Sequence, residues 1–249
     1  MNDKIEAFGN LHMPGNPLIL YNIWDAGSAV AVANAGAKAI ATGSWGVACS
    51  LGFKDGETLP LGSALENLER ILKVTELPVT IDMEAGYGAS SAAVGASVER
   101  AASAGAVGIN IEDKDPVTRQ LFSTDDAAAR VGAAAASGLW INARTDLFII
   151  APKDEHDAAL ADAVIERGKA YADAGANSLF VPFVYDAALI ARICEKSPLP
   201  VNILVGQGIP DIKTLAGLGV ARISHGHGPW ATAMQQLGEA AALAMASLD

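Results

Sequence analysis

The sequence has 249 residues, of which 51% are hydrophobic, and its formal net charge at pH 7 is −11. This charge argues against a nucleic-acid partner, because proteins that bind nucleic acids neutralise phosphates with clustered Lys and Arg. The apolar runs are shorter than the roughly 20 residues that span a membrane, and the mixed charges of the first residues do not predict a signal peptide. The only two cysteines, Cys49 and Cys194, do not predict a disulfide framework. We expect a cytoplasmic protein with neither a nucleic acid nor a membrane as partner.

Short apolar segments alternate along the chain with longer Ala-rich segments of helical period. Strands are predicted at residues 18–25, 39–44, 78–85, 108–113, 140–146, 178–183, 201–206 and 222–226. Helices are predicted near residues 28–36, 63–75, 91–104, 124–137, 155–174, 186–196, 210–217 and 230–247. A glycine follows several of these helices, as a C-cap favours: Gly36, Gly105, Gly138, Gly175 and Gly219.

Eight strand-then-helix units with short connections indicate a parallel α/β sheet, and eight units suit a closed (β/α)₈ TIM-type barrel. We therefore predict a single barrel domain over residues 1–249. An open, doubly wound sheet is the alternative, and it would normally carry a Gly-rich phosphate loop after its first strand. Residues 24–28 read Trp-Asp-Ala-Gly-Ser and lack that pattern, which favours the barrel.

Charged residues end several predicted strands, on the face of a barrel where active sites form. Asp82 and Glu84 are two residues apart on the third strand and would face the same point, while Glu112 ends the fourth strand. Two carboxylates ~4 Å apart repel by about 4 kcal/mol at an effective dielectric near 20, and a divalent cation removes that cost. Oxygen ligands of this kind suit Mg²⁺ or Mn²⁺. A lone acidic residue such as Asp25 is more often a helix N-cap, and Asp113 should point to the opposite face as a structural partner.

Several motifs together resemble the isocitrate lyase and phosphoenolpyruvate mutase superfamily. Residues 82–88, Asp-Met-Glu-Ala-Gly-Tyr-Gly, are similar to its Asp-x-Asp/Glu-x-Gly-Tyr-Gly signature, although these glycines also suit a simple turn. Residues 108–114 resemble its Glu-Asp-Lys/Gln strand, and residues 141–146 resemble its Ala-Arg-Thr-Asp strand. Residues 17–26 and 46–55 also match, so the resemblance extends in order from about residue 8 to residue 230.

The resemblance implies a role for each matching position. Asp82 would bind Mg²⁺, with Glu84 and Glu112 contributing directly or through water. Asp55 and Glu112 would act in catalysis near the metal, and Arg144 would pair with an oxygen or anionic group of the substrate. These are the residues that we expect to carry the reaction.

Three neighbouring residues would complete the substrate site. The resemblance implies that backbone N–H groups of Gly43 and Ser44 hold the substrate carboxylate. Trp45 would either line the rim of the pocket or pack under the second helix, and the sequence leaves both open.

The expected reaction follows from these ligands. A small 2-oxo acid would chelate Mg²⁺ through its carboxylate and keto oxygens, and the ion would stabilise the negative charge that develops as a bond to C3 breaks. The sequence therefore predicts a Mg²⁺-dependent lyase that cleaves or decarboxylates a small 2-oxo or 2-hydroxy (di)carboxylate through an enolate-like intermediate. One alternative is hydrolysis or mutation of a carbon–phosphorus bond in a phosphonopyruvate-like substrate. Another is a metal-binding barrel without efficient catalysis.

Two motifs of known superfamily members are missing from the chain. True isocitrate and methylisocitrate lyases carry a Lys-Lys/Arg-Cys-Gly-His motif, whose Cys is thought to be the general acid, whereas residues 115–122 read Asp-Pro-Val-Thr-Arg-Gln-Leu-Phe. The Lys-Thr-Asn/Cys-like lid element of the mutase is also absent. These differences argue against isocitrate cleavage and against phosphoryl migration, and they leave the proton donor unidentified.

Other residues have weaker claims to function. His225 and His227 end the last predicted strand, where a structural role is expected to outweigh a catalytic one. Lys54 and Lys114 are in charged, loop-proximal positions, which does not favour a Schiff base.

The apolar segment 231–248 needs a partner surface, and superfamily members resemble one another in exchanging their last helices. We therefore expect a homodimer or homotetramer, the tetramer being favoured.

Overall fold

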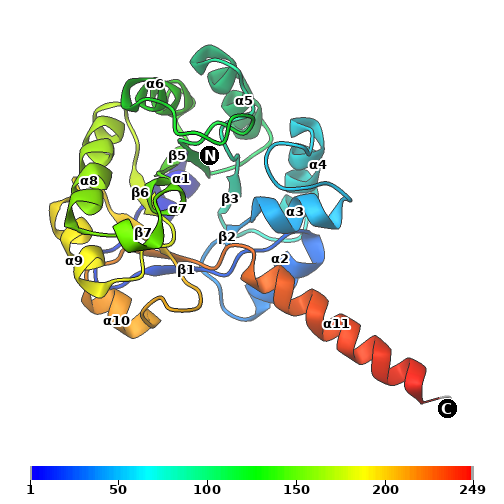
Figure 1. Ribbon diagram of the computed structural model, residues 1–249. Coiled ribbons are helices and arrows are strands. Elements are labelled where there is room, and N and C mark those ends of the chain that lie inside the picture. Colours follow the sequence, from blue (N-terminus) through cyan, green and yellow to red (C-terminus); the bar gives the residue numbers. More distant parts are fainter. Residues whose placement is uncertain (1, 248–249) are drawn as a thin grey trace.

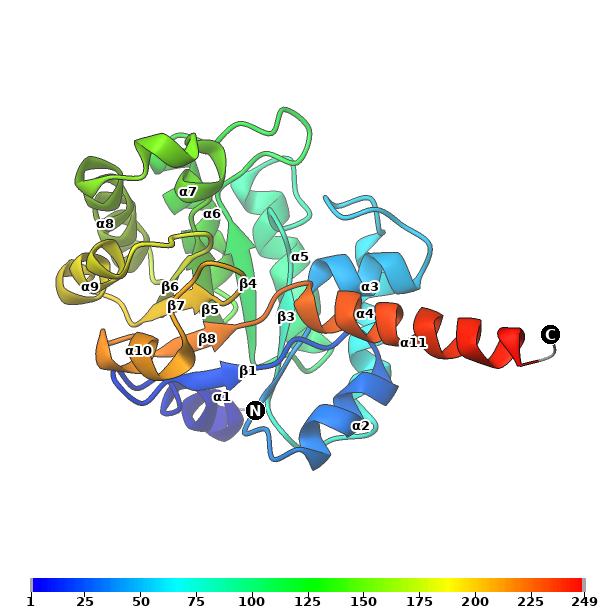
Figure 2. The same cartoon turned by 60° about the horizontal axis from the view of Figure 1, so that its bottom comes forward.

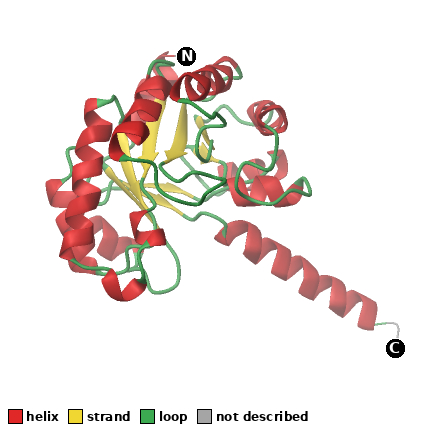
Figure 3. Ribbon diagram, turned by 45° about the horizontal axis from the view of Figure 1, so that its top comes forward, coloured by secondary structure: helices red, strands yellow, loops and turns green. Residues whose placement is uncertain are grey.

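The computed structural model describes residues 2–247 and has eight parallel strands surrounded by helices (Figures 1 and 3). The strands are β1 (Leu18–Leu20), β2 (Ile40–Ala41), β3 (Val79–Asp82), β4 (Gly108–Glu112), β5 (Trp140–Arg144), β6 (Ser178–Val181), β7 (Val201–Leu204) and β8 (Arg222–Ser224). The helices are α1 (Asn2–Gly9), α2 (Ala26–Asn34), α3 (Ser44–Ser50), α4 (Leu61–Leu72), α5 (Ser91–Ser103), α6 (Thr124–Ala135), α7 (Leu147–Ile150), α8 (Ala158–Asp173), α9 (Ala187–Lys196), α10 (Ile212–Gly217) and α11 (Gly228–Ala246). All eight predicted strands are present, and each is shorter than predicted.

The strands are hydrogen-bonded in the order β1-β8-β7-β6-β5-β4-β3-β2. The barrel closes just beyond β1 and β2, where Ile23 forms a parallel bridge with Thr42. There the Ile23 N–H donates to the Ala41 carbonyl at 2.9 Å, and the Gly43 N–H donates to the Ile23 carbonyl at 3.0 Å. The predicted (β/α)₈ barrel is confirmed, and the open doubly wound sheet is excluded.

Side chains alternate along each strand between the barrel axis and the surrounding helices. Ile109 and Ile111 of β4 are buried in the main apolar core beneath the helices, where each contributes about 1.5–3 kcal/mol. Asn110, between them, lies on the axis, where its Oδ1 accepts hydrogen bonds from Asn142 at 2.8 Å and from Arg222 at 3.0 Å. The barrel interior is therefore polar along part of its length.

Helix α1 was not predicted from the sequence, and it closes the floor of the barrel. Its Phe8 is fully buried, with ring centroids 4.8 Å from His12 and 6.2 Å from Trp140. His12 in turn stacks on Trp140 at 4.6 Å. This aromatic cluster fills the end of the barrel opposite to the strand ends that carry the charged residues.

The predicted helix caps, which depend only on residues close together in the sequence, were confirmed. Asp25 caps α2 as expected, since its Oδ1 accepts from the Ser28 N–H at 2.7 Å and the Ser28 hydroxyl is turned back to the cap. All the predicted C-cap glycines have positive φ, from 74° at Gly138 to 102° at Gly105 and Gly175.

Helix α11 extends away from the barrel instead of covering β8 and β1 (Figures 1 and 2). Pro229 is its buried residue, whereas Leu237 is 63% exposed and Leu243 is 76% exposed. Leu248, which ends the predicted apolar segment, lies outside the described residues. Over residues 2–247, no helix is both long and apolar enough to cross a membrane.

Candidate active site at the carboxyl ends of the strands

Asp82 ends β3 and is oriented by backbone groups. Its N–H donates to Thr42 Oγ1 at 3.0 Å, which links β3 to the strand beside it. Its carboxylate accepts from the Ser44 N–H at 3.3 Å and from the Glu84 N–H at 3.2 Å. Burial raises the pKa of Asp82, and the charge of Asp55 adds to that rise although Arg144 opposes it. Within residues 2–247 no Lys or Arg forms an ion pair with this carboxylate, so it is oriented without being neutralised.

Glu84 lies close to Asp82, as predicted, but it is in the turn after β3 and not on the strand. Strand β3 ends at Asp82, and Glu84 lies in the following turn with a φ of 49°, so the period-two argument was wrong. Its Oε2 accepts from the N–H groups of Gly56 and Glu57, both at 2.7 Å, and its Oε1 accepts from the Tyr87 hydroxyl at 3.1 Å. Burial and then the charge of Asp82 raise the pKa of Glu84 to about 8. Three protein donors therefore hold Glu84 in place.

The glycines of the Gly-Tyr-Gly motif shape this turn. Gly86 has a φ of 101°, and a Cβ at that position would lie 2.8 Å from Val94. A Cβ at Gly88 would overlap the Val94 backbone. Glu57, which the sequence did not single out, accepts from the Tyr87 N–H at 2.8 Å and thereby ties the turn to the loop after α3. The expectation that these glycines form a turn is confirmed.

A second charged cluster lies at the ends of β4 and β5. Arg144 donates through Nε and Nη2 to the two oxygens of Asp146, at 2.5 and 3.0 Å, and its Nη1 is 2.8 Å from Glu112 Oε2. Lys114 pairs with Asp146 and lies 3.5 Å from Glu112 Oε1. Burial raises the pKa of Glu112 to about 7, although Arg144 opposes the rise. Two of the five guanidinium N–H groups of Arg144 thus donate to Asp146 and Nη1 forms an ion pair with Glu112, which leaves at least one hydrogen on each terminal nitrogen without a hydrogen-bond acceptor among the described residues.

Lys114 lies two residues beyond the end of β4, in a charged, loop-proximal position as predicted. It is nevertheless buried, with only 6% of its surface exposed. An amine held between the carboxylates of Asp146 and Glu112 is not the free nucleophile that a Schiff base requires. Lys54, by contrast, is exposed, and it lies in a loop as predicted.

Asp113 is a structural partner, as expected from its position on the outer side of β4. Its Oδ1 accepts from the Asp146 N–H at 2.9 Å. Its Oδ2 accepts from the Tyr171 hydroxyl at 2.7 Å and from Arg167 Nη1 at 3.1 Å. These bonds fix the backbone of Asp146, and so they hold the carboxylate that orients Arg144.

The predicted substrate-binding residues lie at the start of α3. The Gly43 N–H donates to the Ile23 carbonyl and the Ser44 N–H donates to Asp82, so both N–H groups that were predicted to hold the substrate carboxylate have protein acceptors in this structure. Trp45 is 46% exposed, and its ring lies 5.5 Å from that of His227, which places it at the rim. Asp55 is exposed on the loop after α3, and its charge raises the pKa of Asp82 and that of Glu84.

His225 has the structural contacts that were expected of it. Its Nδ1 lies 3.3 Å from the Leu20 carbonyl, its N–H donates to Asn22 Oδ1 at 2.9 Å, and its ring packs 4.9 Å from Tyr21. Burial lowers its pKa. It connects β8 to β1 at the upper edge of the barrel.

The donor set fits Mg²⁺ with few protein ligands. In the described part of the chain, no three Asp, Glu, His or Cys side chains converge closely enough to enclose an ion. Mg²⁺ commonly keeps several waters and binds one or two carboxylates together with its substrate. Asp82, which has no ion-pair partner among residues 2–247, fits a direct ligand, whereas Glu84 and Glu112 are held by protein donors and fit contacts through water.

Comparison with known proteins places this barrel in a family. The family model described as phosphoenolpyruvate phosphomutase matches residues 8–245. The chain belongs to that family. The superfamily that the motifs predicted, of isocitrate lyase and phosphoenolpyruvate mutase, is thereby confirmed.

Proteins that are similar to this chain have names that refer to different reactions. A crystal structure from Burkholderia cenocepacia J2315, provisionally named a phosphonomutase, is 46% identical, with a TM-score of 0.95 over 98% of this chain and 99% of that one. The 2-methylisocitrate lyase of Escherichia coli is 31% identical over 77% of this chain and 70% of its own length. The oxaloacetate decarboxylase of Pseudomonas fluorescens is 32% identical over 74% of this chain and 65% of its own length.

Proposed function

We propose that this protein is a Mg²⁺-dependent lyase that cleaves or decarboxylates a small 2-oxo or 2-hydroxy (di)carboxylate through an enolate-like intermediate. The observation that carries this proposal is the Asp82 carboxylate, oriented by the N–H groups of Ser44 and Glu84 and without an ion-pair partner in residues 2–247. An oriented, buried and uncompensated carboxylate at a strand end is suited to a hard cation. Mg²⁺, when bound, would supply the positive charge that stabilises an enolate.

The side chains around Asp82 would bind and orient the substrate. Arg144 keeps one hydrogen on each terminal nitrogen, and these can donate to a carboxylate or another anionic oxygen of the substrate. Its position is fixed by Asp146 and Glu112, so the guanidinium is preorganised before the substrate binds. Trp45 and Asp55 lie on the exposed rim, where they would limit the access of water and of larger substrates.

Two of the similar proteins break carbon–carbon bonds, which supports the lyase proposal. Residues 115–122 lack the Cys-Gly-His element of methylisocitrate lyases, which favours a reaction with less demand for a protein acid, such as loss of carbon dioxide. The test is a screen of 2-oxo and 2-hydroxy dicarboxylates with Mg²⁺ or with EDTA, following pyruvate and carbon dioxide together. Metal-dependent release of either product supports the proposal. The absence of both, with every substrate, overturns it.

Carbon–phosphorus chemistry is the second candidate function. It is favoured by the phosphonomutase name of the 46% identical structure. Phosphonopyruvate in the same screen separates the two reactions, because hydrolysis releases inorganic phosphate and mutation forms phosphoenolpyruvate. Saturable Mg²⁺ binding without any turnover would instead identify a metal-binding barrel without efficient catalysis.

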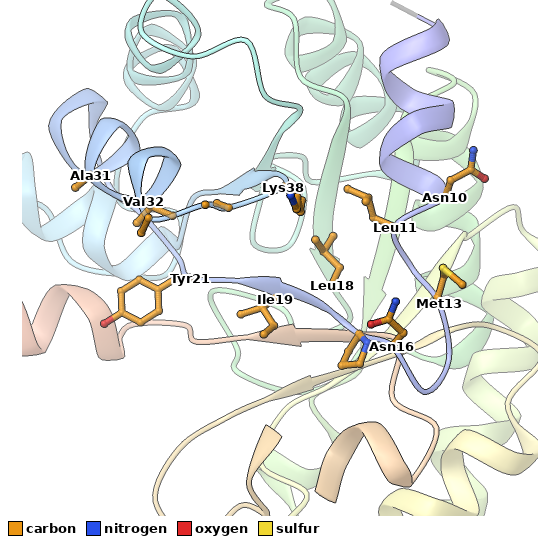
Figure 4. Close-up of a pocket in the computed structure, with 14 residues that line it drawn as sticks. Asn10, Leu11, Met13, Asn16, Leu18, Ile19, Tyr21, Ala31, Val32 and Lys38 are labelled. Atoms are coloured by element: carbon orange, nitrogen blue, oxygen red, sulfur yellow. The ribbon is translucent and has the colours of Figure 1, made fainter. Parts of the chain in front are cut away.

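We also propose that α11 packs on a second copy of the chain. An apolar hollow of about 890 Å³ lies between β1, α2 and the segment after α1, where the eighth helix of an ordinary barrel would cover β1 (Figure 4). Ile19 of β1 and Tyr21, the residue that follows β1, are 43% and 45% exposed there. Because α11 carries exposed Leu237 and Leu243 away from its own barrel, the helix of a partner chain has the length and the apolar character to cover this surface.

The assembly is tested by light scattering at micromolar concentration. The full chain should form a dimer or tetramer, and Tyr21→Asp in the hollow should give a monomer of 25.5 kDa. A charged substitution at Val117, which is exposed and does not line the hollow, is the matched control and should leave the assembly unchanged. A full-length monomer would contradict the proposal.

A further inference from the structure

Arg222 is a fully buried cation inside the barrel. It is 0% exposed on β8, and its Nη2 donates to Asn110 Oδ1 at 3.0 Å. Its Nε and Nη1 have no hydrogen-bond acceptor among the described residues, and no carboxylate there lies within ion-pair distance. Burying a guanidinium with so few partners is costly, so its retention needs an explanation beyond packing.

The topology places this guanidinium beneath the candidate active site. Strands β8 and β4 lie on opposite sides of the barrel, with β7, β6 and β5 between them, so the bond from Arg222 to Asn110 crosses the interior. Asn110 pairs in register with Asp82 of β3. On β4 itself, Glu112 follows Asn110 by two residues and therefore lies on the same side of the strand, closer to the mouth.

Arg222 lies between Asp82, near the mouth of the barrel, and His12, near its floor. Burial lowers the pKa of Arg222 to about 9, and Asp82 is the charged group that opposes this shift. On the opposite side, towards the floor, His12 is buried, and burial and Arg222 lower its pKa to about 3. At neutral pH a positive charge thus lies above a neutral imidazole and below the carboxylates of the site.

We infer that Arg222 is a positioning residue whose buried charge attracts the substrate anion from below, acting across Asp82 and Asn110 without touching the substrate. In the water-poor barrel interior this attraction is screened less than at the surface. The ligand that it favours is a small dianion, the charge of a 2-oxo acid in its enolate form. The inference rests on the proposed function, because it concerns the same metal and substrate site.

Removing the charge should change the affinities for cation and anion in opposite directions. Arg222→Gln keeps an amide that can donate to Asn110 but removes the charge. It should bind Mg²⁺ about tenfold more tightly and oxalate, measured at saturating Mg²⁺, about tenfold more weakly, each a change of ~1.4 kcal/mol. Arg222→Lys keeps the charge and should stay close to the native protein in both titrations. Isothermal titration calorimetry measures all four affinities without turnover.

The control and the alternatives separate charge from packing. Ile193→Ala removes a fully buried apolar side chain from α9, in the helix layer, and should lower the melting temperature while moving both affinities less than about twofold, far below the tenfold change of a lost charge. If Arg222→Gln does not fold, Arg222→Met replaces it. If Arg222→Gln binds both Mg²⁺ and oxalate more weakly, or if neither affinity changes, Arg222 has a structural role and the inference is overturned. A native protein that binds neither Mg²⁺ nor oxalate would overturn the proposed function as well.

Discussion

The substitution Arg144→Lys tests how much the Arg144 guanidinium contributes to stability through its ion pairs with Asp146 and Glu112. In the native protein, three guanidinium nitrogens hold Asp146 and Glu112 at distances of 2.5 to 3.0 Å. A lysine has one ammonium and cannot hold both carboxylates in this geometry. The partner side chains are 0% and 12% exposed, so the loss is only slightly screened by solvent. We expect the free energy of unfolding to fall by about 3 kcal/mol, the lower end for disrupting a buried ion pair.

This change is large enough to measure in two ways. For a chain of this size, a loss of about 3 kcal/mol lowers the melting temperature by ~6–12 °C. The value of kcat/KM should also fall, roughly ten- to a hundredfold, because the two N–H groups that remain for the substrate are removed with the guanidinium. Mg²⁺ affinity should change much less, since Asp82 is the expected ligand. Urea unfolding, kinetics and Mg²⁺ titration are measured on the same preparation.

Arg192→Lys is the matched control. Arg192 forms a two-bond pair with Asp162, both bonds at 2.7 Å, but on the exposed surface. Its replacement should leave the unfolding midpoint and kcat/KM nearly unchanged. Native stability in Arg144→Lys would refute the structural argument. A lower melting temperature with native kcat/KM would leave Arg144 as a residue that supports the fold alone.

Three further outcomes follow from the same geometry. Because burial raises the pKa of Glu84 to about 8 and that of Glu112 to about 7, the folded chain binds these protons more tightly than the unfolded chain. The free energy of unfolding of the metal-free protein should therefore fall as the pH rises from about 5 to about 8. Added Mg²⁺ should restore more of this free energy at the higher pH. Urea unfolding that shows a metal-free protein more stable at higher pH would contradict this expectation. Gly88→Ala should lower stability by roughly 1–3 kcal/mol, because its Cβ would overlap the Val94 backbone, and a native melting temperature would refute the turn geometry. Gly62→Ala, in the first turn of α4 with open space around the added Cβ, should raise stability by about 0.4–1 kcal/mol in the same thermal scan, because Ala has less freedom than Gly in the unfolded chain; a decrease would contradict the open space seen there.

The barrel was predictable because its signals are local. Strand-forming runs, helical periods and C-cap glycines are each set by residues close together in the chain, and repeating the pattern eight times leaves few architectures. The N-cap role of Asp25 and the outward position of Asp113 follow from the same short-range rules. Strand lengths were overestimated because apolar residues continue into the loops, as at Met83 and Ala85, which are buried beyond the end of β3.

The rest of the site depends on contacts between distant segments. Glu84 was expected on the strand, but its carboxylate is positioned by the N–H groups of Gly56 and Glu57, about thirty residues earlier in the chain, a link that periodicity does not reveal. The buried position of Arg222 follows from a hydrogen bond across the barrel to Asn110, and Arg is usually assigned to the surface. Helix α1 was missed because it is a single short helix with mixed charges, stabilised by packing against Trp140.

The central claim is that Asp82 binds the Mg²⁺ on which the chemistry depends, and a calorimetric titration of Mg²⁺ into the native protein and into Asp82→Ala tests it most directly. Oxalate is present in both titrations, because a dianion completes the ligand set of a Mg²⁺ ion that has few protein ligands. The native protein should bind one Mg²⁺ per chain, and the folded variant should show no saturable binding. Equal Mg²⁺ affinity in the two proteins would contradict the account.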